Sequence, residues 1–313
     1  MKKLSSQAFE EIKVWIYKNA RQMEIALWGY HFENGSKEAV LSALSLYQND
    51  DGGFGNTLEP DSWNPNSSPY TTLHAIDKLN DINFTDKNHP IMQGIFKFIE
   101  SGLHSDDNGW LFSIPSNDDY PHAPWWTYDS EANKYESIGV SAGIACFILK
   151  YADKNSLIYE KALAVINKLL DKLNTSGTYG EMGVGGYLAL KDRLIQLDMS
   201  DKFDIEYLSN TVKQLVNNSI ERDISKWEFY GKKPSDFIPS PNSEFYEGNE
   251  EITQRELDYI IDHRTYKGVW DITWSWFENN EKYPKEFAIS ENWWKAHVAI
   301  EKVRLLRNFN RIE

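Results

Sequence analysis

Cysteine is almost missing from this chain of 313 residues, because Cys146 stands alone. One thiol cannot form an internal disulfide, and it excludes a zinc site built from several thiolates. Cys146 lies in the apolar run GIACFILKY, so we predict a buried and inert thiol. Long apolar runs are also lacking: no stretch of about 18 apolar residues occurs, and we expect no membrane-spanning helix.

An excess of basic residues is lacking too. The sequence holds 33 Lys and Arg against 47 Asp and Glu, for a net charge of −14. Nucleic-acid binding needs clustered positive charge that displaces counterions from phosphate, so the composition argues against a nucleic-acid partner. The start, MKKLSSQAFEEIKVW, lacks the apolar segment of a signal peptide, because Glu10 and Glu11 interrupt it. We therefore expect a soluble protein of the cytoplasm.

Strand patterns are scarce, because β-branched residues rarely alternate with polar ones over the length of a strand. Apolar residues instead recur at helical spacing, as Val40, Leu41 and Leu44 do within residues 37–48. A last helix is expected after Ser290 as its N-cap. Further helices are predicted at residues 6–30, 69–80, 88–101, 135–153, 157–173, 180–198, 204–221 and 249–263. The predicted fold class is all-α.

One type of turn recurs after predicted helices. The copies are Asp51-Gly52-Gly53-Phe54, Asp107-Asn108-Gly109-Trp110 and Tyr266-Lys267-Gly268-Val269-Trp270. Glycine permits a positive φ, Asp or Asn bonds the turn backbone, and the aromatic residue is expected to pack between helices. The spacing of the first two copies fits one helical hairpin, so about six hairpins would fill the chain. Hairpins that cannot bury their faces alone stack together, and we predict one domain over residues 1–313 that closes into a ring round a cavity.

A family resemblance agrees with this architecture. The segment VLSALSLYQNDDGGFG resembles the glutamine–tryptophan repeat of the terpenoid cyclases and protein prenyltransferases, with Phe54 at the tryptophan position. The longer set DGGFG-LEPD, DNGWLFSIPS, YPHAPWW, KKPSDFIPSP and GVWDITWSWF resembles a group of bacterial proteins on that fold, over nearly the whole chain. The resemblance implies an α/α toroid, with Gln48 capping a neighbouring helix end. A shared fold does not carry function with it.

The residues that define two activities of that fold are not matched here. Squalene-type cyclases resemble one another in an Asp-x-Asp-Asp motif, whereas the nearest strings here, QNDD and SNDD, lack the first Asp. Protein prenyltransferases share an Asp/Cys/His zinc site, but Cys146 lies in an apolar run, and the seven His show no paired-ligand spacing. P-loop and Gly-x-Ser-x-Gly strings are missing as well. We predict no metal and no cofactor.

The first segment with residue types for acid/base chemistry is Leu58-Glu59-Pro60-Asp61. A proline pushes the preceding residue towards extended backbone, which would place Glu59 and Asp61 on one side of the chain. Two carboxylates that share a low-dielectric site raise the pKa of one of them, which provides an acid and a base. The alternative interpretation is that Asp61 bonds a turn and Glu59 is solvated.

The densest segment is Asn117–Trp126, which Pro121 and Pro124 stiffen. Histidine moves protons near neutral pH, and indole faces stack on sugars or contact cationic and polyene ligands. The catalytic candidates in this segment are Asp118, Asp119 and His122, and the ligand-binding candidates are Trp125 and Trp126. The alternative interpretation is a packed corner in which His122 bonds a carbonyl group.

Further ligand-binding candidates are Asp236 in the segment PSDFIPSP, and Asp271 and Trp274 in the segment WDITW. Turn formation explains these residues equally well. In the predicted toroid, the mouth of the cavity would be formed by the loops near residues 54–66, 106–134, 229–246 and 266–280.

These observations lead to one functional hypothesis and two alternatives. The hypothesis is a protein that binds a small, partly apolar or isoprenoid-like ligand, with or without transforming it by acid/base chemistry. The first alternative is a carbohydrate hydrolase or lyase on the same barrel, which would pair carboxylates about 5–10 Å apart. The second is a non-catalytic binding or scaffold protein. The sequence leaves this choice, the substrate and the oligomeric state open.

Overall fold

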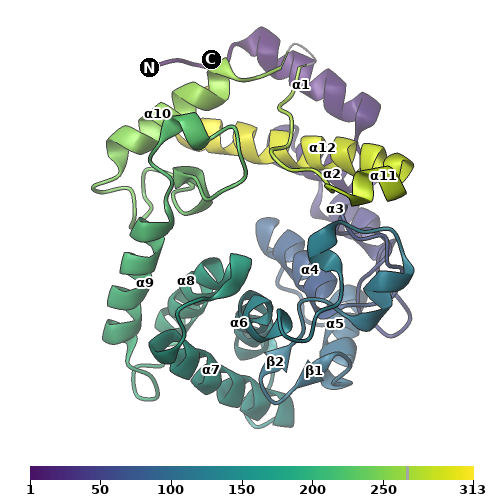
Figure 1. Cartoon of the computed structure of the whole chain (residues 1–313), viewed down its shortest axis with the longest axis vertical. Helices are drawn as coiled ribbons and strands as arrows, with labels where there is room; N and C mark the ends of the chain where they lie inside the picture. The colour runs from purple at the N-terminus through teal and green to yellow at the C-terminus, as the bar shows by residue number, and fades with distance from the viewer. Residues whose placement is uncertain (266–267) are drawn as a thin grey trace. The chain divides into compact units, whose positions relative to one another are not determined.

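The computed structural model describes residues 1–265 and 268–313, and its regular structure is mostly helical (Figure 1). Contacts along the chain divide it into two compact units. Unit 1 comprises residues 1–43 and 216–313, and unit 2 comprises residues 44–215. The predicted all-α class is confirmed, since a pair of two-residue strands forms the only sheet among the described residues.

The boundaries between the units fall inside helices α3 (Lys37–Ser45) and α9 (Ile205–Ser219). The remaining elements of unit 2 are α4 (Pro69–Asp81), α5 (Pro90–Glu100), β1 (Ser105–Asp106), β2 (Gly109–Trp110), η1 (Pro115–Asp119), η2 (Pro124–Trp126), α6 (Asn133–Tyr151), α7 (Leu157–Thr175) and α8 (Gly180–Gln196). Those described in unit 1 are α1 (Ser6–Asn19), α2 (Gln22–Phe32), η3 (Ile224–Lys226), η4 (Pro234–Asp236), α10 (Glu250–Asp262), α11 (Asn279–Lys282) and α12 (Pro284–Asn308).

Helix α6 is the centre of unit 2 and packs against α4, α7, α8 and β2. The buried residues of α6 lie on most of its sides, which is the pattern expected of a helix that other elements cover on several sides. Glycines let α6 and α8 approach closely, because a Cβ added at Gly139 would lie 2.4 Å from the Cβ of Met182. Cys146 is buried on the same helix, as predicted, and burial raises the pKa of its thiol to about 12.

The first recurring turn is fixed by its own side chains and by α4. Asp51 Oδ1 accepts the N–H of Gly53 at 2.9 Å, which is the backbone bond predicted for an aspartate in a turn. Phe54 is fully buried, and its N–H donates to Thr72 Oγ1 in α4 at 3.1 Å. Phe54 is therefore buried next to α4, whereas its expected position between two helices stays a prediction.

Gln48 and Gly52 hold this turn against α5. The Gln48 amide donates to the carbonyl oxygens of Gly52, at 2.9 Å, and of Ile91, at 3.0 Å. Gly52 has a φ of 91°, and a Cβ added there would lie 2.1 Å from the carbonyl oxygen of Gly94. Gln48 therefore contacts the first turn of α5 through a carbonyl group, rather than through the free N–H groups that a helix cap bonds.

The second recurring turn combines the same kinds of residue as the first, and it contacts α6. Asp106 Oδ1 accepts the N–H of Asn108 at 2.6 Å, and Gly109 has a φ of 131°. Trp110 is buried, and its N–H donates to Ser141 Oγ at 2.9 Å. A turn carboxylate, a positive-φ glycine, a buried aromatic ring and a helix hydroxyl thus occur together in both copies.

The third predicted turn is only partly described, because Tyr266 and Lys267 lie outside the described residues. In the remaining part, Gly268 has a φ of 103°, and the buried indole of Trp270 donates to the Ile260 carbonyl at 2.7 Å. This copy therefore shares the positive-φ glycine and the buried aromatic ring.

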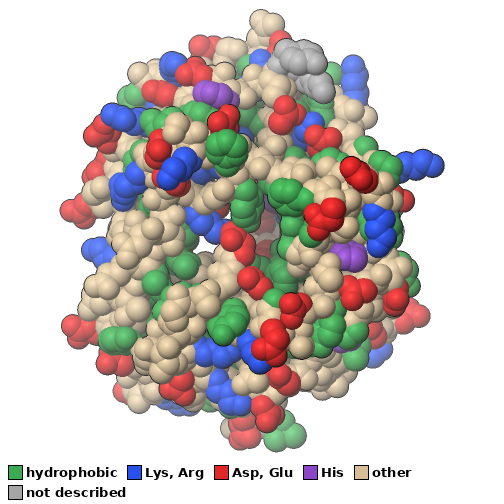
Figure 2. Space-filling view, viewed as in Figure 1, with side chains coloured by type: hydrophobic (Ala, Val, Ile, Leu, Met, Phe, Trp, Pro, Cys, Tyr) green, Lys and Arg blue, Asp and Glu red, His purple; other side chains and the backbone are tan. Residues whose placement is uncertain are grey.

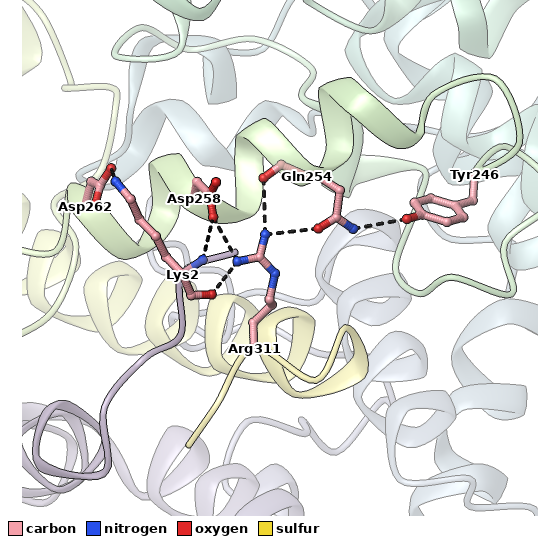
Figure 3. A network of polar contacts seen from close by, with 6 residues as sticks. All are labelled: Lys2, Tyr246, Gln254, Asp258, Asp262 and Arg311. Carbon is pink, nitrogen blue, oxygen red and sulfur yellow. Dashed lines mark hydrogen bonds and ion pairs between the residues drawn. The ribbon is translucent and has the colours of Figure 1, made fainter.

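In unit 1, α12 packs against α1 and α2, and Arg311 joins the two ends of the chain to α10 (Figure 3). The N–H of Leu4 donates to the Arg311 carbonyl at 2.8 Å. The Arg311 guanidinium is 2% exposed and donates to Asp258 at 2.8 Å, to Gln254 Oε1 at 3.0 Å and to the Lys2 carbonyl. The two terminal nitrogens of this buried charge thus have acceptors, as burial of an ion requires, while its Nε has none among the described residues.

Two helix predictions are wrong at particular residues. The helix expected over 6–30 is interrupted, because Ala20 and Arg21 adopt extended backbone between α1 and α2. Arg21 there donates to Glu24 with two nitrogens, at 2.9 and 2.5 Å, and this ion pair is buried. The last helix begins at Pro284, where a first-turn proline costs no hydrogen bond, and Ser290 is a buried residue inside it rather than its N-cap.

The surface carries charges of both signs. On the face shown in Figure 2, acidic side chains are interspersed with basic ones. Over residues 1–265 and 268–313, we find no helix whose length and apolar character would let it cross a membrane.

Candidate functional site

Two loops of unit 2, residues 56–67 and 113–128, are bonded to each other, and we call them the paired loops. Ser62 and His122 form an antiparallel bridge. The N–H of Trp63 donates to the Pro121 carbonyl and the N–H of Ala123 donates to the Asp61 carbonyl, each at 2.9 Å. The structure therefore brings the first two predicted catalytic segments together.

Two buried asparagines, neither of them predicted as a site residue, strengthen this pairing. The Asn64 amide donates to Ser116 Oγ and to Asn117 Oδ1, each at 2.9 Å, and the Asn117 amide donates to the Trp126 carbonyl at 2.9 Å. Both side chains are 4% exposed. Asn64 precedes Pro65 in a segment rich in turn formers, and that setting was the available signal.

Glu59 and Asp61 are both buried, with 2% and 1% of their surface exposed. The extended segment predicted to place Glu59 and Asp61 on one side does not continue to Asp61, because residues 59–62 form a turn in which the N–H of Ser62 donates to the Glu59 carbonyl at 3.1 Å. Pro60 occupies the second position of this turn, where its fixed φ is favourable. Glu59 Oε1 also accepts the N–H of Asp61 at 3.2 Å, which ties the two acidic residues together.

His122 is 5% exposed, and both of its ring nitrogens have neighbours. Nδ1 lies 2.6 Å from the carbonyl oxygen of Tyr120, and Nε2 lies 3.1 Å from Thr127 Oγ1. Because a carbonyl oxygen only accepts, Nδ1 carries a proton, and in the neutral ring Nε2 is then the acceptor. The contact with a carbonyl agrees with the alternative interpretation of this segment and also sets the tautomer that a general base needs.

Asp118 and Asp119 are exposed, unlike the other acidic candidates of the paired loops. Asp118 Oδ1 accepts the N–H of Tyr128 at 2.9 Å, so this side chain holds the backbone of its own loop. These positions give both residues access to solvent and distinguish them from Glu59 and Asp61.

The two neighbouring tryptophans differ in environment. Trp126 is 3% exposed, stacks on Phe112 with a centroid distance of 4.6 Å, and meets Tyr70 edge-on at 4.3 Å. Its indole Nε1 is buried and has no acceptor among the residues described. Trp125 is 37% exposed and offers its ring at the surface of the same loop.

Asp236, Asp271 and Trp274 belong to unit 1, where each has local partners. Asp236 Oδ2 accepts the N–H of Lys233 at 2.7 Å, and the ring of Trp274 meets that of Trp294 at a centroid distance of 5.3 Å. Asp236 is the last residue of η4 and bonds back to Lys233, which precedes that helix, and Trp274 lies beside α12.

Asp271 is exposed and pairs with Lys295 of α12 at 2.8 Å. Glu291, one helical turn away, holds the same ammonium group at 2.9 Å. Burial lowers the pKa of Lys295, but the hydrogen bonds to Asp271 and Glu291 outweigh it, and the pKa lies above its ordinary value. The carboxylate of Asp271 is therefore engaged in an ion pair.

Glu256 of α10 is a further buried carboxylate, 2% exposed, that was not predicted as a site residue. It accepts the Ser235 N–H at 2.7 Å and the Ser235 hydroxyl at 2.6 Å. Burial raises the pKa of Glu256 to about 7, although the bonds from Ser235 oppose this shift. The signal was weak, because TQRELDYI reads as an ordinary amphipathic helix in which one acidic residue does not stand out.

This pKa predicts a pH-dependent stability. The folded state holds the Glu256 proton more tightly than the unfolded state, so the stabilisation is complete below about pH 4.5 and is lost as the pH rises through about 7. Glu256→Gln keeps the uncharged form at every pH. The free energy of unfolding of Glu256→Gln minus that of the wild type should therefore be larger at pH 8 than at pH 5, by on the order of 3 kcal/mol.

Urea unfolding at the two pH values measures this difference. Glu251→Gln is the matched control, because Glu251 is exposed on the same helix. We expect its effect to be the same at both pH values. A Glu256→Gln effect that is also independent of pH would contradict the prediction.

The described residues contain no group of three or more His, Cys, Asp or Glu side chains placed to hold a metal ion. Comparison of the chain with protein-family models, with curated proteins and with solved structures finds no match. The function proposed below therefore rests on the geometry of the paired loops.

Proposed function

We propose that this chain binds a small, partly apolar or isoprenoid-like ligand at the paired loops of unit 2 and transforms it by acid/base chemistry. The observation that carries the proposal is the bonding of residues 61–63 to residues 121–123, which puts two buried carboxylates and a histidine in one assembly. Carboxylates are seldom buried without a specific role, because removing their charge from water is costly.

The proposed roles follow from the chemistry of each side chain. His122 exchanges protons at Nε2, since Nδ1 is directed at a carbonyl oxygen. Glu59 and Asp61 provide the acid and the base, as two carboxylates in one buried turn do not both ionise easily. Trp125 offers an exposed ring for the apolar part of the ligand, and the unsatisfied N–H of Trp126 offers a donor for a polar atom.

The proposal includes the fold expected from the sequence, an α/α toroid formed as one domain by residues 1–313 and related to the terpenoid cyclases and protein prenyltransferases. The two matching turns around Phe54 and Trp110 support it, because they repeat the same contacts with α4 and α6. A small molecule is the proposed partner, rather than a nucleic acid, and the cytoplasm is the proposed compartment.

Turnover by matched variants tests this function. The wild type, Glu59→Gln, His122→Ala and the control Glu100→Gln are incubated with a small-molecule extract, and the consumed compounds are followed by mass spectrometry. Glu100 is exposed at the end of α5, outside the paired loops. We expect the control to match the wild type and the other two variants to lose about 100-fold or more in rate, the effect of removing a general acid or base.

Unchanged turnover in both Glu59→Gln and His122→Ala would end the acid/base assignment. The second function that an observation favours is binding without catalysis. The contacts of both His122 nitrogens and the packing of Trp126 against Phe112 and Tyr70 agree with a loop whose histidine takes no part in proton transfer. In that case, no compound would be consumed even by the wild type, although a ligand would still be retained.

A further inference from the structure

Unit 1 contains a cavity of about 350 Å³ that the proposed function does not use. Its volume is at the lower end of the range for small-molecule sites. The lining has two apolar residues, two carboxylates and one guanidinium group, together with the Lys302 amine, the Ser235 hydroxyl and the Asn308 amide. This combination of a reactive amine with polar and apolar walls suits a small organic ligand.

Lys302 differs in its ionic contacts from Lys295, which lies two helical turns earlier on α12. Lys295 is held by Asp271 and Glu291, whereas Lys302 has no carboxylate within ion-pair distance in the described part of the chain. The Lys302 ammonium instead lies 5.2 Å from the centroid of the Trp270 ring. An aromatic face stabilises a cation weakly and does not accept conventional hydrogen bonds from it. The Lys302 nitrogen therefore remains available to react with a ligand.

The surroundings favour the neutral amine. Burial lowers the pKa of Lys302 to about 8, and the charge of Lys233 acts in the same direction, against Glu256 and Asp271. Other charged groups at the cavity are Asp236, Glu301 and Arg304. At pH 7.5, roughly a quarter of an amine with this pKa is neutral, compared with roughly a thousandth of an ordinary lysine.

A buried acid lies behind the cavity wall. Ser235 lines the cavity, and its hydroxyl donates to Glu256 at 2.6 Å. Because burial raises the pKa of Glu256 to about 7, this carboxyl group gains and loses a proton near neutral pH. Ser235 and Glu256 therefore provide a route by which a proton reaches or leaves a ligand in the cavity.

We propose that Lys302 is a nucleophile that forms a reversible imine with a small aldehyde or ketone bound in this cavity. The neutral amine gives its electron pair to the carbonyl carbon, the C=O π pair moves to oxygen, and that oxygen takes a proton. The nitrogen loses one proton as the carbinolamine forms. The carbinolamine hydroxyl group then takes a proton from solvent or from the Ser235–Glu256 pair and leaves as water, and the nitrogen returns its remaining proton to the same source. A C=N bond replaces the C=O bond, the two protons of the amine balance the water released, and nothing is oxidised or reduced.

Reductive trapping tests the inference. The full-length protein is incubated with benzaldehyde and sodium cyanoborohydride at pH 7.5, and peptide mass mapping gives the rate at which each lysine is benzylated. We expect Lys302 to react at least about 10-fold faster than Lys295, the internal control on the same helix, and faster than exposed lysines such as Lys285. Lys302→Arg should remove the fast reaction and leave the other sites unchanged.

A second variant tests the role of the cavity. Asn308 lines the cavity from an exposed position, so Asn308→Trp narrows the space without replacing a core residue. This variant should slow labelling at Lys302 and leave labelling at Lys285 unchanged. Labelling of Lys302 at the rate of an exposed lysine would overturn the inference, and fast labelling that Asn308→Trp does not slow would overturn the assignment to this cavity. Glu59→Gln should not alter any of these rates, so failure here is distinct from failure of the proposed function.

Discussion

Replacing Gly52 by alanine is expected to lower the free energy of unfolding of unit 2 by about 3 kcal/mol or more. Its φ of 91° disfavours any residue with a Cβ. The added carbon would also lie 2.1 Å from the Gly94 carbonyl oxygen, so either the turn or α5 must move. That movement would disturb the Gln48 amide, which bonds the first turn of α5. Chemical denaturation followed by circular dichroism measures the loss.

Gly177→Ala is the matched control in the same unit. Gly177 is exposed, and a Cβ added there would meet no atom within 4 Å. We expect a change within about 0.5 kcal/mol for this variant. Equal effects of the two substitutions would show that the first recurring turn is not held closely against α5.

The second large effect is expected from Arg311→Met. Methionine keeps most of the apolar stem but leaves Asp258, Gln254 Oε1 and the Lys2 carbonyl without their shared donor. Loss of one partner from a buried ion pair costs about 3–5 kcal/mol, and we expect about 3 kcal/mol because the Asp258 side chain is 39% exposed to water. Denaturant unfolding measures the loss of stability.

Arg255→Met is the control for this prediction. Arg255 lies on α10, the helix that Arg311 contacts, and its ion pair with Glu251 is exposed on both sides. Such pairs contribute about 0–1 kcal/mol, so the control should change stability little. Hydrogen exchange adds a local measurement, because the Leu4 N–H bonded to the Arg311 carbonyl should exchange faster in Arg311→Met only. Similar stability and exchange in both variants would contradict the role assigned to Arg311.

Much of the secondary structure could be predicted from the sequence, because local chemistry decides it. The turn at Phe54 was predictable, since aspartate and glycine there favour one local conformation and the aromatic ring must be buried. The interruption at Arg21 was not predictable. An ion pair between Arg21 and Glu24 accompanies it, but both residues also fit an amphipathic helical pattern. The start of α12 at Pro284 was missed for a related reason: Ser290 is a good cap by type, but it is buried inside the helix.

The candidate site shows the same division between local and non-local causes. Pro60 favours extended backbone in Glu59 and a turn with itself in the second position, and that turn ends the extended segment before Asp61. Asn64 and Asn117 could not be assigned, because their hydrogen bonds join segments far apart in the sequence. The position of His122 beside Asp61 is also a product of pairing between distant loops, which residue spacing alone does not encode.

The most direct test of ligand binding at the paired loops is an NMR titration of the tryptophan indole N–H signals. The probes are small partly apolar and sugar-like compounds, among them geraniol and cellobiose, and Trp125→Phe assigns the signal of Trp125. We predict that a binding compound shifts the signals of Trp125 and Trp126 in a saturable manner. Compounds that bind while shifting only the indoles of unit 1, such as Trp274 and Trp294, would contradict the proposed site.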